Sequence, residues 1–345
     1  MKSIAIASFI GAAAIAAAAA TAVQAQQEDT LATIQERGSL LCTGHNGSYL
    51  GFAEIDDQGE WQGFDIEFCR ALATAILGTP DAVQIIPLSF AQRFPSLQSG
   101  DIDVIIKVTG WSQSRDTELG LQYSRPYFIG PFFVMAQTAL GAESIEDLEG
   151  GTFCVNSGTT VERMLSDYME VNGLPYEQLA FENGEELRSA LYAGRCDALA
   201  GFGPFLVSTR VNAPDPASLT ILPDVIALEA EGIVVREGND SLLDVVNWMV
   251  SILLQAEEAG ITQANVDEFR ANPPSPTIER MLGVSPGVGE RLGLSDDWAY
   301  NVISAVGNYG EIYNRTVGDQ SRYQLPRGLN NLWTNGGLLY PLTLD

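Results

Sequence analysis

One arginine and one hydroxyl-rich turn could together hold an anion. Arg115 follows a predicted buried strand at residues 102–106, and a guanidinium matches a carboxylate with two parallel hydrogen bonds. Ser157-Gly158-Thr159-Thr160 lies between a predicted strand and a predicted helix, where free backbone amides and the helix dipole favour an anion. Alone, Arg115 could pair with Asp116 on the surface, and the turn could merely cap its helix. Together, the two motifs predict one carboxylate held from two sides.

Aromatic and basic side chains in neighbouring loops could complete such a site. Lys107 is the one lysine after Lys2, and at the end of its predicted strand it could contact a ligand or form an ion pair. His45 is the one histidine and lies in the first strand-to-helix loop, where exposure to solvent is the alternative to ligand contact. For each aromatic residue the alternative is core packing. The candidates for an aromatic wall are Tyr49, Phe52, Phe90 and Trp111.

Two units of alternating strands and helices must position these groups. The alternation favours a largely parallel sheet that presents its ligand-binding loops at the carboxyl ends of the strands. The first unit is predicted to have strands at 39–43, 83–88 and 102–106, a helix at 66–77 that Asp65 caps, and a helix at 91–98. The second is predicted to have strands at 152–155 and 197–200 and helices at 144–148, 161–171 and 187–192.

The segments around the second unit link it to the rest of the chain. Two apolar stretches flank it, at residues 127–135 and 225–235, and we interpret them as extended crossings between two lobes. A long amphipathic helix is predicted at 242–259. A proline-rich break at 273–276 then starts a third section, with a helix near 296–309. This section lacks polar catalytic groupings, and we expect it to pack across a lobe.

The first 25 residues are typical of a secretory signal peptide. Lys2 precedes an alanine-rich apolar run that ends in Ala-Val-Gln-Ala, and a membrane anchor is the alternative. About 320 residues (345 − 25) remain after cleavage, which is more than one core usually supports. We therefore expect residues 1–25 as signal peptide, 26–132 with 231–270 as lobe 1, 133–230 as lobe 2, and 271–345 as a C-terminal extension on the lobes.

Charge and cysteine content narrow the class of protein. The formal net charge of −26 argues against nucleic acid as a partner, because phosphate backbones are bound by clustered Lys and Arg. Four cysteines without a CxxC pair, in an exported chain, predict two disulfides. A zinc site is the alternative, but the spacing typical of metal ligands is absent. Three pairings are possible. We expect a staple within each lobe, Cys42 with Cys69 and Cys154 with Cys196.

The order and spacing of several short strings carry a family resemblance. The strings are Gly63-Phe64-Asp65-Ile66-Glu67, Leu97-Gln98-Ser99-Gly100-Asp101-Ile102-Asp103-Val104, Ser114-Arg115-Asp116, Tyr123-Ser124-Arg125-Pro126-Tyr127 and Ser157-Gly158-Thr159-Thr160. Over nearly all of the mature chain they resemble the polar amino-acid-binding proteins of bacterial ABC importers. Residues 306–313 and 327–330 resemble the general L-amino-acid-binding branch. The resemblance implies an α/β, two-lobed type II periplasmic binding protein, a Venus flytrap with a hinge.

The resemblance also implies roles for individual residues. Arg115 would grip the α-carboxylate of the ligand, and Thr109 and the Gly110 amide would add donors. Ligand held by both lobes would stabilise the closed form, since a hinge closes only as far as the ligand prefers that state. The expected ligand contacts are Tyr49, Phe90, Lys107, Thr109, Gly110, Trp111, Arg115, Ser157, Gly158, Thr159, Thr160 and Phe202.

Two places depart from the family pattern. In the segment before Arg115, Val108 and Gly110 lack the hydroxyls that the family usually has. The second departure is at a position in the second lobe. The family usually has an aspartate there that pairs with the α-ammonium of the ligand, whereas this chain has Phe202, and no acidic residue occurs at 198–213. A buried ammonium needs a counter-charge or several acceptors. Either Glu54, Asp56 or backbone carbonyls replace the aspartate, or the ligand is a keto, hydroxy or quaternary-ammonium acid. Aromatic rings could surround a cation of the last kind.

These expectations describe a periplasmic binding protein that delivers a small carboxylate, by resemblance an amino acid, to an inner-membrane ABC permease. We expect a monomer with no cofactor, no metal and no nucleic-acid partner. An enzyme on the same fold is the first rival, because dehydratases resemble this family. It would need a general acid or base in the cleft, and Glu54, His45 and Lys107 form no recognisable constellation. The sensor domain of a receptor is the second rival.

Overall fold

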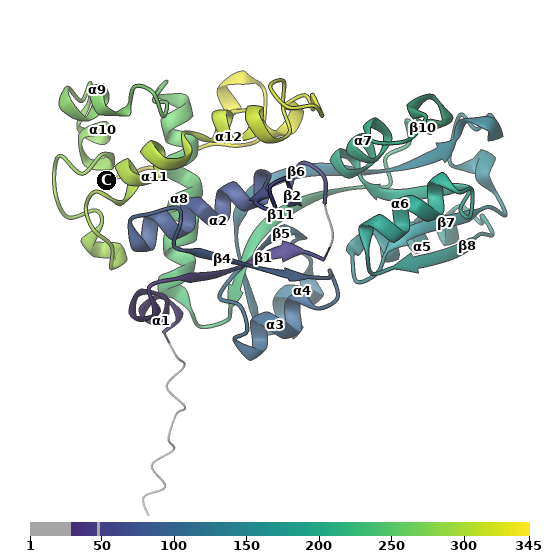
Figure 1. The fold of residues 1–345 in the computed structure, drawn as a ribbon, viewed down its shortest axis with the longest axis horizontal. Coiled ribbons are helices and arrows are strands. Elements are labelled where there is room, and N and C mark those ends of the chain that lie inside the picture. Colours follow the sequence, from purple (N-terminus) through teal and green to yellow (C-terminus); the bar gives the residue numbers. More distant parts are fainter. Residues whose placement is uncertain (1–28, 47–48) are drawn as a thin grey trace, which may run out of the picture.

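The protein has two α/β lobes joined by two long strands (Figure 1). The structure is a computed structural model and describes residues 29–46 and 49–345. The expected signal peptide lies outside the described residues. Within the described part of the chain, no helix combines the length and the apolar character needed to cross a membrane.

A short parallel sheet forms the centre of the first lobe. β1 (Leu40–His45) pairs in parallel with β4 (Val83–Leu88), and a bridge between Cys42 and Val104 leads to β5 (Ile105–Gly110). These strands place their carboxyl ends at one edge, as predicted for ligand-binding loops. The other elements of this lobe are α1 (Thr30–Arg37), α2 (Phe64–Leu77), α3 (Arg93–Ser99), α4 (Gln113–Glu118) and a small hairpin of β2 (Glu54–Ile55) and β3 (Trp61–Gln62).

Helix α2 starts differently from the sequence prediction. Its N-cap is Gly63, with φ 124°, and the prediction that Asp65 caps the helix is wrong. Asp65 lies fully buried in the first turn and accepts a 2.7 Å hydrogen bond from the hydroxyl of Tyr127. A Cβ at Gly63 would lie 2.3 Å from the carbonyl oxygen of Phe52. The close approach of these two backbones therefore requires glycine at the start of α2.

The two predicted crossings are both strands of one sheet. β6 (Leu121–Gln137) and β11 (Ala227–Arg236) pair antiparallel and run through both lobes. The seven-stranded sheet has the order β5-β11-β6-β9-β7-β8, and β10 adds to β6. The sheet is therefore mixed and not largely parallel, because the crossing strands pair antiparallel with β5 and β9.

The second lobe covers its end of this sheet with helices. β7 (Thr152–Asn156) pairs in parallel with β8 (Glu177–Phe181) and β9 (Ala198–Phe202). The sequence analysis did not predict β8 or α7, the helix that follows β9. The remaining elements are α5 (Thr160–Val171), α6 (Gly184–Tyr192), α7 (Gly203–Val211), β10 (Leu219–Ile221) and the 3₁₀ turns Thr138–Leu140, Glu146–Leu148 and Pro216–Ser218.

Two disulfides have the predicted pairing. Cys42 is bonded to Cys69 in the first lobe, and Cys154 is bonded to Cys196 in the second. Each bond therefore joins elements of a single lobe and leaves relative motion of the lobes unconstrained.

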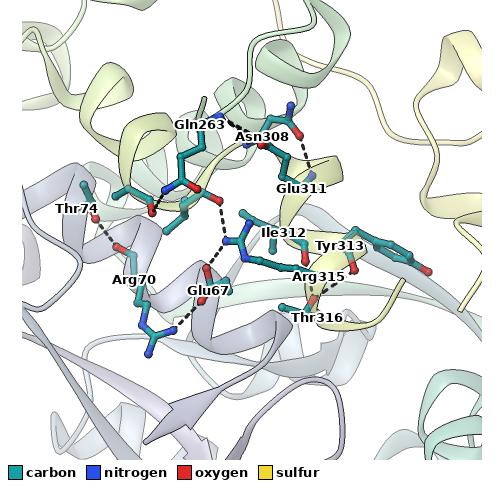
Figure 2. Close-up of polar contacts among 12 residues, drawn as sticks. Glu67, Arg70, Thr74, Gln263, Asn308, Glu311, Ile312, Tyr313, Arg315 and Thr316 are labelled. Atoms are coloured by element: carbon teal, nitrogen blue, oxygen red, sulfur yellow. Dashed lines mark hydrogen bonds and ion pairs between the residues drawn. The ribbon is translucent and has the colours of Figure 1, made fainter. Parts of the chain in front are cut away.

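The C-terminal residues pack against α2 and α8 of the first lobe (Figure 1). The helix predicted near 296–309 is two helices, because Gly307 ends the first at φ 74° and Asn308 caps the second with Glu311. Arg315 forms an ion pair with Glu67 of α2, as Figure 2 shows. The elements are α8 (Asp240–Glu258), α9 (Val266–Ala271), α10 (Pro276–Met281), α11 (Trp298–Val306), α12 (Tyr309–Thr316) and the 3₁₀ turns Glu290–Leu292, Gly328–Asn330 and Trp333–Asn335.

Candidate functional site

A cavity of about 30 Å³ lies where the two lobes and the crossing strands meet. Its walls combine opposed charges with aromatic rings. A wider surface groove beside α8 has one charged side chain, Glu258, in its lining, so it lacks that combination. The residues that line the cavity are Tyr49, Phe90, Arg93, Val108, Gly110, Arg115, Phe132, Asn156, Thr159, Thr160, Val161, Gly201, Phe202, Phe205, Glu229 and Glu231.

Arg115 and Arg93 bring two guanidinium groups to one backbone carbonyl. Arg115 is 9% exposed, and it donates to the carbonyl oxygens of Gly110 at 2.9 Å and Gly158 at 3.4 Å. Arg93 is buried and donates to the carbonyl of Phe90 and, at 3.5 Å, to the same Gly158 oxygen. Burial, followed by the charge of Arg115, lowers the pKa of Arg93 to about 9. Two guanidinium groups placed in this way could attract an anion, and their contacts with the Gly158 carbonyl tie the first lobe to the second.

The turn before α5 lies against the first lobe, so the structure brings it together with Arg115. Gly158 has φ 74°, and a Cβ there would be 3.0 Å from the backbone of Ala91. Its amide donates to Glu162, and the hydroxyl of Thr159 donates to the carbonyl of Asn156. Thr159 and Thr160 line the cavity. Glycine is needed here both for its backbone conformation and for the contact between lobes.

Two glutamates of β11 supply the acidic side of the cavity. Glu229 and Glu231 are two residues apart on the strand, so they share a face, and they are 6% and 1% exposed. Glu229 accepts a 2.7 Å hydrogen bond from the hydroxyl of Thr160. It packs over Gly110, where a Cβ would lie 1.9 Å from its carboxyl carbon. Burial raises the pKa of both carboxyls, and the charge of Glu229 further raises that of Glu231.

Glu229, Glu231 and Arg93 line the cavity but were not predicted from the sequence. The signal for the glutamates was an acidic pair at alternate positions in an apolar crossing, which is unusual for a strand buried on both faces. The signal for Arg93 was its position three residues after Phe90, at the start of the helix that follows β4.

Phe202, which stands where the resemblance implies an aspartate, is 4% exposed. Its ring packs against Gly130, Phe128 and Phe132. The proposed replacements for the aspartate lie elsewhere. Glu54 accepts hydrogen bonds from Arg322 and the hydroxyl of Tyr323. Asp56 stabilises a turn by accepting from the amides of residues 58 and 60. The expectation that Glu54 or Asp56 faces the ligand is therefore corrected, and β11 supplies the cavity's carboxylates.

Aromatic rings close one side of the cavity. Tyr49 stacks on Phe205 of the second lobe, with ring centroids 4.6 Å apart, and Phe90 meets Tyr49 edge to face. His45 stacks on the other face of this group at 4.7 Å from Tyr49. It is 5% exposed, and burial, followed by the charge of Lys107, lowers its pKa well below the usual value. The exposed position considered for His45 is therefore wrong.

Several expected ligand contacts lie outside the cavity lining. Lys107 is fully buried behind it, donates to the carbonyl of Gly44 at 3.0 Å and lies over the ring of Phe90. Thr109 is buried and donates to the Lys107 carbonyl. Trp111 is 45% exposed and stacks on Tyr123. Ser157, Gly158 and Phe52 are likewise absent from the lining among the described residues.

Comparisons with known proteins agree with this architecture. Residues 41–263 match the model of the bacterial extracellular solute-binding proteins, family 3. The chain is 43% identical to the general L-amino acid-binding periplasmic protein AapJ of Rhizobium johnstonii, over 99% of this chain and 98% of that protein. It is 40% identical to the glutamate/glutamine/aspartate/asparagine-binding protein BztA of Rhodobacter capsulatus, over 96% and 97%.

A solved structure covers both lobes. A periplasmic binding protein of an ABC transporter from Brucella ovis, with glutathione bound, is 42% identical and superposes with a TM-score of 0.87 over 91% of this chain and 98% of that one. The family match extends over more than half of the chain, and both relatives match almost end to end. The chain therefore belongs to the bacterial extracellular solute-binding proteins, family 3.

Proposed function

We propose that this protein is the periplasmic solute-binding component of an ABC importer and that its ligand is an amino acid bound as a zwitterion. The observation that carries the proposal is the charge balance of the cavity. Two guanidinium groups, of Arg93 and Arg115, face two carboxyl groups, of Glu229 and Glu231. A molecule with one carboxylate and one ammonium adds no net charge to these four buried side chains. The electrostatic cost of burying such a ligand is therefore low.

The carboxylate of the ligand would lie between the lobes. Arg115 would hold it from the first lobe, with the Gly110 amide, and the start of α5 at Thr159 and Thr160 would hold it from the second. Contacts from both sides stabilise the closed form only, so binding drives closure. The side chain of the ligand would then face Tyr49, Phe90 and Phe202, which favours an uncharged side chain.

The same proposal assigns a role to each part of the chain. Residues 26–132 with 231–270 would move as lobe 1 and residues 133–230 as lobe 2, with 271–345 fixed to the first lobe. A closed monomer would present both lobes to an inner-membrane permease. The relatives are named as binding proteins, which supports a carrier in preference to an enzyme.

Keto and hydroxy acids fit the proposal less well than amino acids. Each has a carboxylate for Arg115 but no ammonium that could form a charge-assisted hydrogen bond with the glutamates of β11. A quaternary-ammonium acid has both charges but cannot donate a hydrogen bond to a carboxylate. The proposal therefore ranks amino acids first among the ligand classes.

The test is calorimetry on the mature protein after unfolding and refolding to remove any copurified solute. The panel contains the twenty standard L-amino acids, their 2-hydroxy and 2-keto analogues, and glycine betaine. We expect micromolar or tighter binding of at least one amino acid, with an uncharged side chain preferred over an acidic one. Binding of the hydroxy or keto acids alone, or of betaine alone, would contradict the proposal.

A further inference from the structure

We infer that Glu231, on the crossing strand β11, is the residue that binds the ammonium group of the ligand. This assignment rests on the proposed function and names the specificity-determining residue of the same site. The carboxylate that pairs with the ammonium would then lie on β11, which pairs with β5 of the first lobe. It would not lie at the position of Phe202 in the second lobe. Glu231 lies opposite Gly110 of β5 and Phe128 of β6.

The observation that points to a ligand is an unpartnered oxygen. Glu231 is 1% exposed and lines the cavity. Its Oε2 atom is buried and has no hydrogen-bond partner among the described residues. A buried carboxyl oxygen without a partner costs free energy comparable to a lost hydrogen bond or more. An ammonium in the cavity would supply that partner as a charge-assisted hydrogen bond.

Glu229 is less suited to this role than Glu231. Its Oε2 atom already accepts from the Thr160 hydroxyl at 2.7 Å. Its carboxyl carbon packs over Gly110, so the side chain is fixed on the side of Arg115 and the start of α5. Glu229 therefore helps to hold the lobes together, while the free acceptor belongs to Glu231.

The charges around Glu231 predict a proton released on binding. The groups that act on it are Glu229 of its own strand, Arg115 of α4, Arg93 of α3 and Asp65 of α2. Burial, with the repulsion from Glu229, raises the pKa of Glu231 well above its usual value. An ammonium beside the carboxyl lowers that pKa again, because it favours the charged form. An amino acid should therefore displace a proton from Glu231, whereas a hydroxy acid should not.

Glu231→Gln is the test, with Glu229→Gln as the matched control two residues along the strand. Calorimetry uses each panel amino acid that the wild type binds, together with the 2-hydroxy acid of the same side chain. E231Q should weaken amino-acid binding at least about 30-fold and leave hydroxy-acid binding within about threefold of wild type. E229Q should change both affinities by similar factors. Selective loss of amino-acid binding in E229Q, or none in E231Q, would overturn the assignment.

A second measurement uses the unaltered protein and so does not depend on folding of a variant. Binding enthalpies in buffers of different ionisation enthalpy at pH 7 count the protons released. The amino acid should release more protons than its hydroxy analogue. Equal release by the two ligands in wild type would contradict the role of Glu231. If wild type binds no amino acid of the panel, the proposed function itself fails, which is a separate result.

Discussion

Tyr49 of the first lobe and Phe205 of the second stack face to face at one side of the cavity, with ring centroids 4.6 Å apart and planes 6° from parallel. Arg115 crosses the same gap to the carbonyl of Gly158, and the side chain of Asn183 donates to the carbonyl of Asn46 at 3.0 Å. The two lobes therefore contact each other directly around the cavity. We expect these contacts to favour the closed form before any solute is added.

Phe205→Ala should shift the protein without ligand toward the open form. An aromatic pair contributes about 0.5–1.5 kcal/mol beyond its buried area, so the ratio of closed to open molecules should fall about two- to tenfold. Small-angle scattering should record a larger radius of gyration. Trp111→Ala is the control, because that ring stacks on Tyr123 within the first lobe. If F205A and W111A both scatter like wild type, the stack does not govern closure.

Arg115→Ala should weaken amino-acid binding at least about 100-fold, because a buried, hydrogen-bonded partner of the carboxylate is lost. Arg115→Lys keeps the charge but loses the two parallel bonds, so its affinity should lie between those of wild type and R115A. Calorimetry measures all three proteins. Arg195→Ala, at an exposed position of the second lobe, is the control. Wild-type affinity in R115A would refute the proposed carboxylate site.

Gly158→Ala should impair closure without unfolding a lobe. Its Cβ would meet the backbone of Ala91 at 3.0 Å, and its φ of 74° disfavours any side chain. Gly141 is a matched control, since its φ is 65° but nothing lies within 4 Å of a Cβ. Both variants should lose about 1 kcal/mol of stability from backbone strain.

The two glycine variants should differ in their affinity for the ligand. G158A should bind amino acid at least about tenfold more weakly than G141A, because only its methyl group holds the lobes apart. Thermal unfolding of both proteins checks that the strain is similar. Equal affinities would show that the turn before α5 does not approach the first lobe during binding.

Arg115 and the turn at residues 157–160 could be singled out from the sequence because their signals are local, whereas Arg93 could not. Arg115 follows a short apolar strand, and the turn at residues 157–160 joins a strand to a helix. The local structure of each motif can be predicted from a few consecutive residues. The strand-helix alternation then places both at the carboxyl ends of strands, and the structure has them in contact through the Gly158 carbonyl.

The acidic half of the site could not be predicted in this way. Whether Glu231 points into the cavity depends on the pairing of β11 with β5, where it lies opposite Gly110. A shift of that register by one residue would turn the side chain to the other face. The position of Trp111 was also decided by tertiary packing, since its ring stacks on Tyr123 of β6. Such pairings between distant segments leave no local pattern.

Asp65 should make the stability of the first lobe depend on pH. It is fully buried, and burial raises its pKa from 3.8 to about 7, against opposing effects of Tyr127 and Lys107. Between these two values the folded protein keeps a proton on Asp65 that the unfolded chain has lost. The free energy of unfolding therefore falls as the pH rises from about 4 to about 7 and changes little above that.

Asp65→Asn removes this titration and keeps an acceptor for the Tyr127 hydroxyl. The stability of wild type relative to D65N should fall by up to about 4 kcal/mol across that pH range. Urea denaturation at several pH values measures the difference, and the other carboxyl groups cancel in it. Asp57→Asn, at an exposed position, serves as the control and should follow wild type. A constant difference between wild type and D65N from pH 4 to 8 would mean that Asp65 stays ionised, and Lys107 would then be its buried counter-charge.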